Sequence, residues 1–140
     1  MMLARSGISA GLLIAVFVAS SLGCASMMGT PKQIGPNDMA MLAGKWSGMF
    51  SAPWGQAIPG TIDIMPNGTY TARGGAFLAE GKATIEDGNL TLVPTMTTGV
   101  PTRPRGSSAS LTERSGGTLV LSGYGHSDRG PYNFEVTKQK

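Results

Sequence analysis

Between residues 44 and 138, apolar and polar residues alternate in short runs, and this period of two constrains the fold more than any other feature. From Tyr132 to Lys138, for example, Tyr, Phe and Val alternate with Asn, Glu and Thr. Successive side chains of a β-strand point to opposite faces. Alternation therefore predicts strands that have one buried face and one solvated face.

Eight runs of this kind are separated by Gly, Pro and Asn turns. Asp87-Gly88 is a strong two-residue hairpin signal, because that turn needs positive φ, which Gly adopts freely and Asp tolerates. A short helix is predicted at 39–42, ended by Gly44. Loops are expected at 95–106 and 123–130. The predicted strands are 45–50, 58–65, 69–73, 82–86, 89–93, 108–113, 118–122 and 132–138.

The short connections and the lack of interleaved helices favour an all-β fold. We predict a small antiparallel meander barrel of about eight strands, because closure removes exposed sheet edges. A two-sheet β-sandwich is the alternative. An eight-stranded barrel has an interior that is filled by side chains or holds one small ligand. The residues predicted to face this interior are Gly48, Gly60, Ala72, Ala83 and Ala109, with the larger Trp46, Phe50, Ile62, Ile64, Ile85, Leu90, Leu92, Leu111, Leu119, Leu121, Phe134 and Val136.

The first 23 residues have the order of a secretory signal peptide. Arg5 precedes an apolar run at 8–18, and small residues then lead to Cys24, the only cysteine in the chain. The apolar run is far shorter than the roughly 20 residues that a membrane-spanning helix needs. Residues 20–24 resemble the lipobox of bacterial lipoproteins. This resemblance implies that Cys24 carries a diacylglycerol on sulfur and an N-terminal acyl chain such as palmitate.

The chain is thus expected to have three parts: a signal peptide at 1–23, a lipid-anchored Cys24 with a flexible tether at 24–36, and a β-barrel domain at 37–140. The tether is predicted because residues 25–36 are small or polar and are interrupted by Gly and Pro. The lipobox resemblance makes the membrane the first partner. Since Ala25 rather than Asp follows Cys24, it also implies an outer-membrane anchor facing the periplasm.

Gly44-Lys45-Trp46 resembles the Gly-x-Trp signature that opens the first strand of lipocalins and related calycin barrels. The resemblance implies that Trp46 closes one end of the barrel, with a basic side chain across it. Lys138 is expected to supply that cation–π contact. It also implies non-enzymatic binding of a small hydrophobic ligand, which an Ala83→Phe substitution is expected to block. The expected ligand-binding residues are Trp46, Phe50, Tyr70, Ala83 and Phe134.

Chemistry beyond binding has little support in the sequence. The single histidine, His126, is followed by Ser127 and Asp128, but consecutive loop residues rarely converge as a catalytic triad. No His, Cys or acidic residues have metal-ligand spacing. The net charge of +3 is too mild to indicate nucleic-acid binding. We therefore expect no enzyme activity, no metal, no cofactor and no nucleic-acid partner.

The alternative function is a protein-interaction or inhibitor module with a filled barrel core and an envelope protein as its partner. Trp54 lies between Pro53 and Gly55 and is a candidate exposed aromatic residue. Arg103 and Arg105 lie in the loop expected at 95–106, and loops of about 12 residues often bind partners. Trp54, Arg103 and Arg105 are accordingly the candidate partner-binding residues.

Overall fold

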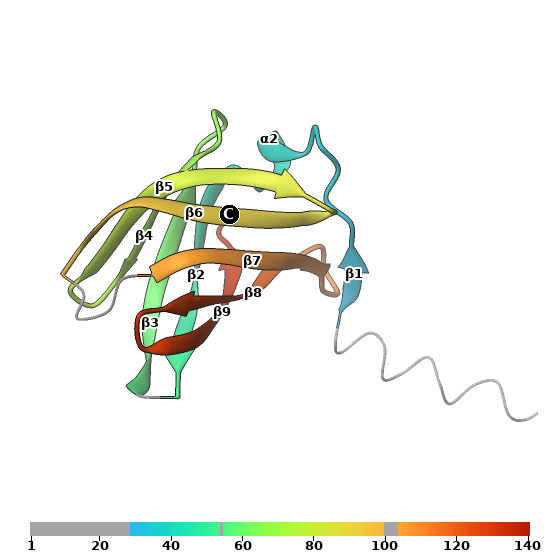
Figure 1. Ribbon diagram of the computed structural model, residues 1–140. Coiled ribbons are helices and arrows are strands. Elements are labelled where there is room, and N and C mark those ends of the chain that lie inside the picture. Colours follow the sequence, from blue (N-terminus) through green and yellow to red (C-terminus); the bar gives the residue numbers. More distant parts are fainter. Residues whose placement is uncertain (1–28, 54, 100–103) are drawn as a thin grey trace, which may run out of the picture.

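The computed structural model describes residues 29–53, 55–99 and 104–140. It is a closed antiparallel barrel of eight strands with one additional short strand (Figure 1). The elements are β1 (Thr30–Lys32), α2 (Met39–Leu42), β2 (Gly44–Ala52), β3 (Gly55–Ile64), β4 (Thr69–Gly74), β5 (Phe77–Glu86), β6 (Asn89–Thr98), β7 (Pro104–Glu113), β8 (Leu119–Ser127) and β9 (Gly130–Lys138). The predicted all-β meander barrel is confirmed, and the sandwich alternative is not adopted.

Each barrel strand pairs with the next one along the chain, and β2 pairs with β9 to close the cylinder. In this closing pair, Gly48 lies opposite Val136, and Phe50 lies opposite Phe134. A Cβ atom at Gly48 would lie 1.9 Å from the carbonyl oxygen of Glu135, so only glycine fits there. Every residue predicted to face the interior is buried or half-buried.

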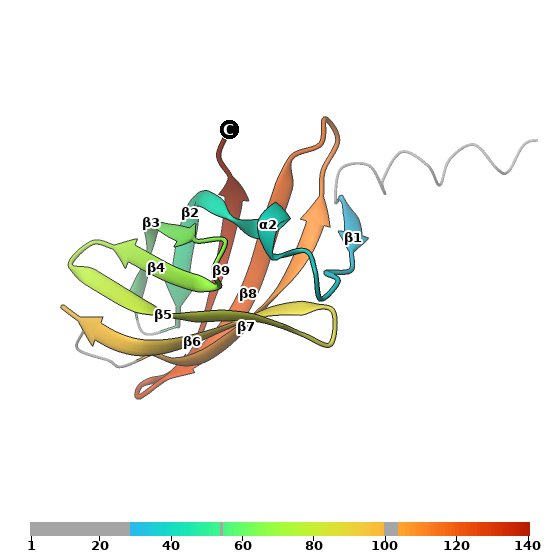
Figure 2. The ribbon, with the colours of Figure 1, turned by 90° about the horizontal axis from the view of Figure 1, so that it is seen from above.

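One end of the barrel, called here the closed end, is covered by α2 (Figure 2). Leu42 and Trp46 are fully buried there. The indole Nε1 of Trp46 donates a hydrogen bond of 2.9 Å to the carbonyl oxygen of Leu42, which ties the helix to the barrel wall. The helix-lined end is therefore a packed core.

Lys138 lies opposite Trp46 in the sheet. Its ammonium group donates a hydrogen bond to the carbonyl oxygen of Met41 at the end of α2. Among the described residues, the only aromatic contact is between Phe50 and Phe134. The predicted cation–π contact between Lys138 and Trp46 is thus wrong, because the free carbonyls at the helix end attract the ammonium group instead.

The segment expected to be a tether contains ordered structure. Thr30, Pro31 and Lys32 pair with the last residues of β7 as strand β1. Ile34 is only 3% exposed and belongs to the core. The folded part of the chain therefore begins before residue 36, because β1 covers an edge of β7 and Ile34 completes the closed end.

Both loops expected in the second half of the chain are mostly strand. Strand β6 continues to Thr98 and β7 begins at Pro104, so the loop predicted at 95–106 is wrong for its outer parts. Pro94 lies at the irregularity between Glu80 and Gly81, where the ladder does not need its missing N–H. Pro104 is the first residue of its strand, a position that proline also tolerates.

The loop predicted at 123–130 is likewise a hairpin of β8 and β9, which meet at Ser127 and Gly130. The glycines that suggested a loop serve another purpose. Gly123 and Gly125 are strand residues. A Cβ atom at Gly123 would lie 2.2 Å from the ring of Phe134, and one at Gly125 would lie 2.7 Å from the hydroxyl of Tyr132. These glycines leave room for aromatic side chains inside the barrel. His126 is an exposed residue of β8.

Candidate ligand-binding cavity

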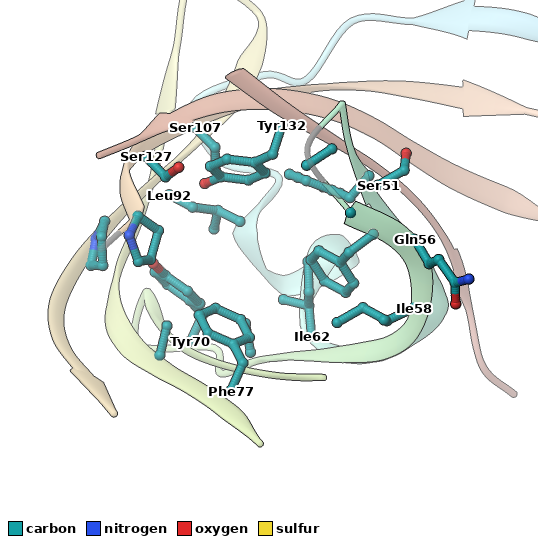
Figure 3. A pocket seen from close by; sticks show the side chains of 18 residues that line it. Ser51, Gln56, Ile58, Ile62, Tyr70, Phe77, Leu92, Ser107, Ser127 and Tyr132 are labelled. Atoms are coloured by element: carbon teal, nitrogen blue, oxygen red, sulfur yellow. The ribbon is translucent and has the colours of Figure 1, made fainter. Parts of the chain in front are cut away.

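The opposite end of the barrel, called here the open end, holds a cavity of about 210 Å³. Strand β2 runs from Gly44 beside α2 to Ala52 at the mouth of this cavity. Figure 3 shows the lining side chains arranged as a ring around an unfilled centre. The apolar lining residues are Phe50, Ala52, Ile58, Ile62, Ala72, Phe77, Ala79, Leu92, Pro94, Pro104 and Phe134.

The cavity is hollow because small residues line part of the wall and the large rings lie flat against it. Ala72 and Ala79 are cross-strand neighbours, and both face inward. A Cβ atom at Gly60 would lie 2.2 Å from the ring of Phe50. A Cβ atom at Gly123 would likewise lie 2.2 Å from the ring of Phe134. Each phenyl ring therefore occupies the space of a missing side chain instead of the centre of the barrel.

The two phenyl rings, those of Phe50 and Phe134, are also in contact with each other. Their centroids are 5.6 Å apart and the ring planes are tilted by 34°, within the range of favourable aromatic pairs. Because β2 and β9 form the closing pair of the barrel, this contact joins the first and last barrel strands. It gives the cavity a rigid apolar wall.

Six polar residues line the cavity: Tyr70 on β4, Ser107 on β7, Ser127 on β8 and Tyr132 on β9, together with Ser51 on β2 and Gln56 on β3. Figure 3 places Tyr70, Ser127 and Tyr132 on one side of the ring, with Ile58 and Ile62 on the other. The hydroxyl of Tyr132 is hydrogen-bonded to the side chain of Ser107. The cavity thus has an apolar side and a hydroxyl-bearing side.

Both cavity tyrosines stay protonated at neutral pH. Burial raises the pKa of Tyr70 well above its ordinary value of 10.0, and the neighbouring Tyr132 raises it further. Burial also raises the pKa of Tyr132, and the hydrogen bond to Ser107 partly opposes this effect. Among the described lining residues none is charged. The arrangement can bind a neutral molecule and offers hydroxyl groups as hydrogen-bond partners.

The expected ligand-binding residues divide between the two ends of the barrel. Phe50, Tyr70 and Phe134 line the cavity. Trp46 is fully buried in the closed end, and Ala83 is 3% exposed in the core beyond the cavity. Neither Trp46 nor Ala83 is among the lining residues, because alternation identifies the inward face of a strand but not the height along the barrel axis.

Several lining residues were missed by sequence reasoning. Tyr132 could have been found, since it alternates with Phe134 on the inward face of the last strand. Phe77 and Ser107 had no such signal, because both lie outside the strands that the alternation predicted. Their strands extend beyond the predicted boundaries.

The partner-binding candidates are only partly covered by the described residues. Trp54 and Arg103 lie outside them, as does Cys24, the predicted lipid-attachment residue. The side chain of Arg105 is 75% exposed, and its guanidinium lies 3.8 Å from the carboxylate of Asp128. An exposed ion pair of this length adds little stability.

Neither a metal site nor a helical membrane span is found in the described part of the chain. Within residues 29–53, 55–99 and 104–140, no three His, Cys, Asp or Glu residues gather closely enough to hold a metal ion. The helix in the same ranges is too short to cross a membrane.

The fold and the cavity define a small antiparallel β-barrel with one packed end and one hollow, mostly apolar end. A scan against protein-family models, a search of curated proteins and a search of solved structures each found no match to this chain.

Proposed function

We propose that this chain is a lipid-anchored, non-enzymatic protein of the cell envelope that binds one small hydrophobic molecule in the open end of its barrel. The observation that supports binding most directly is the cavity itself. Its described lining combines Phe50, Ile62, Leu92 and other apolar side chains with only a few hydroxyl groups. Concave, mostly apolar sites with a few convergent polar groups are typical of ligand pockets.

The size of the cavity limits the ligand. About 210 Å³ is below the roughly 300–1,000 Å³ of pockets for drug-sized molecules. It exceeds the roughly 150 Å³ that is enough for benzene in an engineered apolar cavity of another protein. We infer a ligand, or the inserted part of a ligand, about the size of a singly substituted ring or a short acyl segment.

The position of the N-terminal segment gives the proposed anchor a direction. Thr30 pairs with Glu113 at the end of β7 that lies farthest from Pro104 and the cavity mouth. Figure 1 accordingly shows β1 at the closed end, beside α2. Cys24 precedes Thr30 by six residues, a reach of at most about 20 Å. A lipid on Cys24 would hold the closed end toward the membrane and the mouth toward the aqueous side.

This orientation has a consequence for how the ligand arrives. A mouth that faces away from the anchoring membrane exchanges its ligand with the aqueous compartment or with a soluble carrier, not laterally with the bilayer. The resemblance of Gly44-Lys45-Trp46 to the lipocalin signature is consistent with this orientation, since it implies that Trp46 closes one end of the barrel, and the cavity lies at the other end.

The binding part of the proposal is tested with an apolar fluorescent probe and native mass spectrometry on gently purified protein. Ala79→Phe places a ring in the cavity and is expected to abolish probe binding and any co-purified small molecule. Thr84→Phe is the matched control, because it adds the same ring at an exposed position of the same strand. Equal probe binding by Ala79→Phe and the unchanged protein would contradict binding in this cavity.

The anchor is tested by metabolic labelling with palmitate in a bacterial host. Cys24→Ser is expected to lose the label and to accumulate as an unprocessed precursor, since two or more acyl chains on Cys24 are what make anchoring stable. Ser26→Ala is the control, and it should be labelled normally. Continued labelling of Cys24→Ser would contradict the lipoprotein assignment.

A further inference from the structure

The hydroxyl-bearing side of the cavity is built from side chains of four strands, β4, β7, β8 and β9. Ser107 and Tyr132 both lie next to Gly125 in the sheet, so β7, β8 and β9 bring them together. Tyr70 reaches the same cavity from β4, and Tyr132 also lines it. Figure 3 shows both tyrosine rings at the edge of the open centre.

The hydroxyl groups differ in whether they have a hydrogen-bond partner within the protein. Ser127 bonds within its own turn, to the carbonyl oxygen of Gly130 and the amide of Arg129. Tyr132 bonds to Ser107. The hydroxyl of Tyr70 has no hydrogen-bond partner among the described residues, and its oxygen is accessible from the cavity that Tyr70 lines. A hydroxyl group that faces the cavity without a partner in the protein is free to bond to a ligand there.

The charge of the site narrows the chemistry of that partner. The described lining carries neither a cation to balance a carboxylate or phosphate nor an anion to balance an amine. Placing an unpaired charge in such an environment is strongly unfavourable. Tyr70 is protonated and can donate its hydrogen to an acceptor atom.

We propose that the cavity selects a small neutral amphiphile, in which one carbonyl or hydroxyl oxygen accepts a hydrogen bond from Tyr70 and an apolar body packs against Phe50, Ile62 and Phe134. This inference rests on the proposed function and adds the chemical class of the ligand. Specificity comes from Tyr70, because a ligand without an oxygen at this place displaces water from the Tyr70 hydroxyl and gives it no hydrogen bond in return.

The test uses three probes with one ring each: acetophenone, ethylbenzene and benzoate. Acetophenone carries a carbonyl group, ethylbenzene has no hydrogen-bonding group, and benzoate is charged. The chain has three tyrosines, of which Tyr70 and Tyr132 line the cavity and Tyr124 is 65% exposed. Titrations of the full chain with isotope-labelled tyrosine rings, followed by NMR, therefore report binding at the cavity with Tyr124 as an internal reference.

We expect acetophenone to bind roughly threefold to tenfold more tightly than ethylbenzene, the effect of one net hydrogen bond, and benzoate to bind most weakly. Tyr70→Phe should remove the preference for acetophenone, because the variant offers the carbonyl group no hydrogen-bond donor. Tyr124→Phe is the matched control and should keep the preference, because its ring faces outward.

The outcomes separate this inference from the function on which it rests. Equal affinities for acetophenone and ethylbenzene, or an unchanged preference in Tyr70→Phe, would overturn the role of Tyr70 while leaving apolar binding intact. Tighter binding of benzoate would overturn the selection of neutral ligands. If none of the probes shifts the resonances of Tyr70 and Tyr132, both the inference and the proposed function fail.

Discussion

The division of the barrel into a hollow end and a packed end is tested most sharply by placing the same ring at two heights on one strand. Ala79 and Ala83 both lie on the inward face of β5 and are 2% and 3% exposed. Ala79 lines the cavity, whereas Ala83 lies four residues further toward the closed end, about 13 Å along the strand. Ala79→Phe and Ala83→Phe therefore differ only in what surrounds the new ring.

The expected magnitudes follow from the space available. The cavity beside Ala79 measures about 210 Å³ and exceeds the roughly 150 Å³ that holds a benzene ring elsewhere. Ala79→Phe should thus keep a free energy of unfolding within about 1 kcal/mol of the unchanged protein while it loses ligand binding. Ala83→Phe has no comparable space, and overpacking should cost about 1–3 kcal/mol.

The assay is urea unfolding followed by circular dichroism, with thermal unfolding as a second measurement. For a domain of this size, the cost at Ala83 corresponds to a loss of about 5–20 °C in Tm. An Ala83→Phe protein as stable as Ala79→Phe would refute the reasoning, because it would mean that the barrel is equally hollow at both heights. This substitution at Ala83 is then a test of packing, not the test of ligand uptake that the sequence suggested.

Three further predictions concern the same structure. Burial raises the pKa of Tyr70 above 10.0, so the unfolded chain loses this proton at a lower pH than the folded protein. The free energy of unfolding should therefore fall as the pH rises above about 10, and it should fall less in Tyr70→Phe. Denaturant titrations at pH 8 to 12 measure this fall, and an identical fall in both proteins would contradict the prediction. Gly48→Ala should lower the free energy of unfolding by more than about 2 kcal/mol, because its methyl group would overlap the carbonyl oxygen of Glu135. Gly55→Ala is the control and should be neutral in the same urea assay, because no atom lies within 4 Å of the added methyl group. Similar costs at both positions would contradict the close approach of Gly48 to β9. Trp46→Phe removes the buried 2.9 Å hydrogen bond to the end of α2. It should lower the free energy of unfolding by about 1–3 kcal/mol, measured by thermal or urea unfolding, because a buried carbonyl loses its partner. An unchanged Tm would contradict this prediction and show that the helix end is solvated.

The inward and outward faces of the strands were accessible from the sequence because side-chain direction depends only on position along one strand. The alternation around Ile62, Leu90 and Phe134 therefore predicted the barrel interior correctly. The hairpin at Asp87-Gly88 was equally local, since positive φ at a two-residue turn selects these residue types; Asp87 and Gly88 have φ values of 51° and 79°.

Strand length was not accessible in the same way. Gly123, Gly125, Pro94 and Pro104 are turn-forming residues by local preference, yet all four lie within strands. Pairing with neighbouring strands outweighs these preferences. The glycines are required by rings that approach from other strands, and the prolines lie where the ladder tolerates a missing N–H. Such requirements depend on contacts across the barrel, and a local pattern does not record them.

By itself, the sequence predicted a secretory, lipobox-like leader, and it determined the all-β class and the set of inward residues, because these depend on spacing along the chain. Only the tertiary structure decided which inward residues meet. It separated Trp46 and Ala83 at the packed end from Phe50 and Phe134 around the cavity, and it brought Tyr70 and Tyr132 to the same cavity. The height of a side chain along the barrel axis is set by strand register and barrel closure, and these arise from pairing between segments that are distant in sequence.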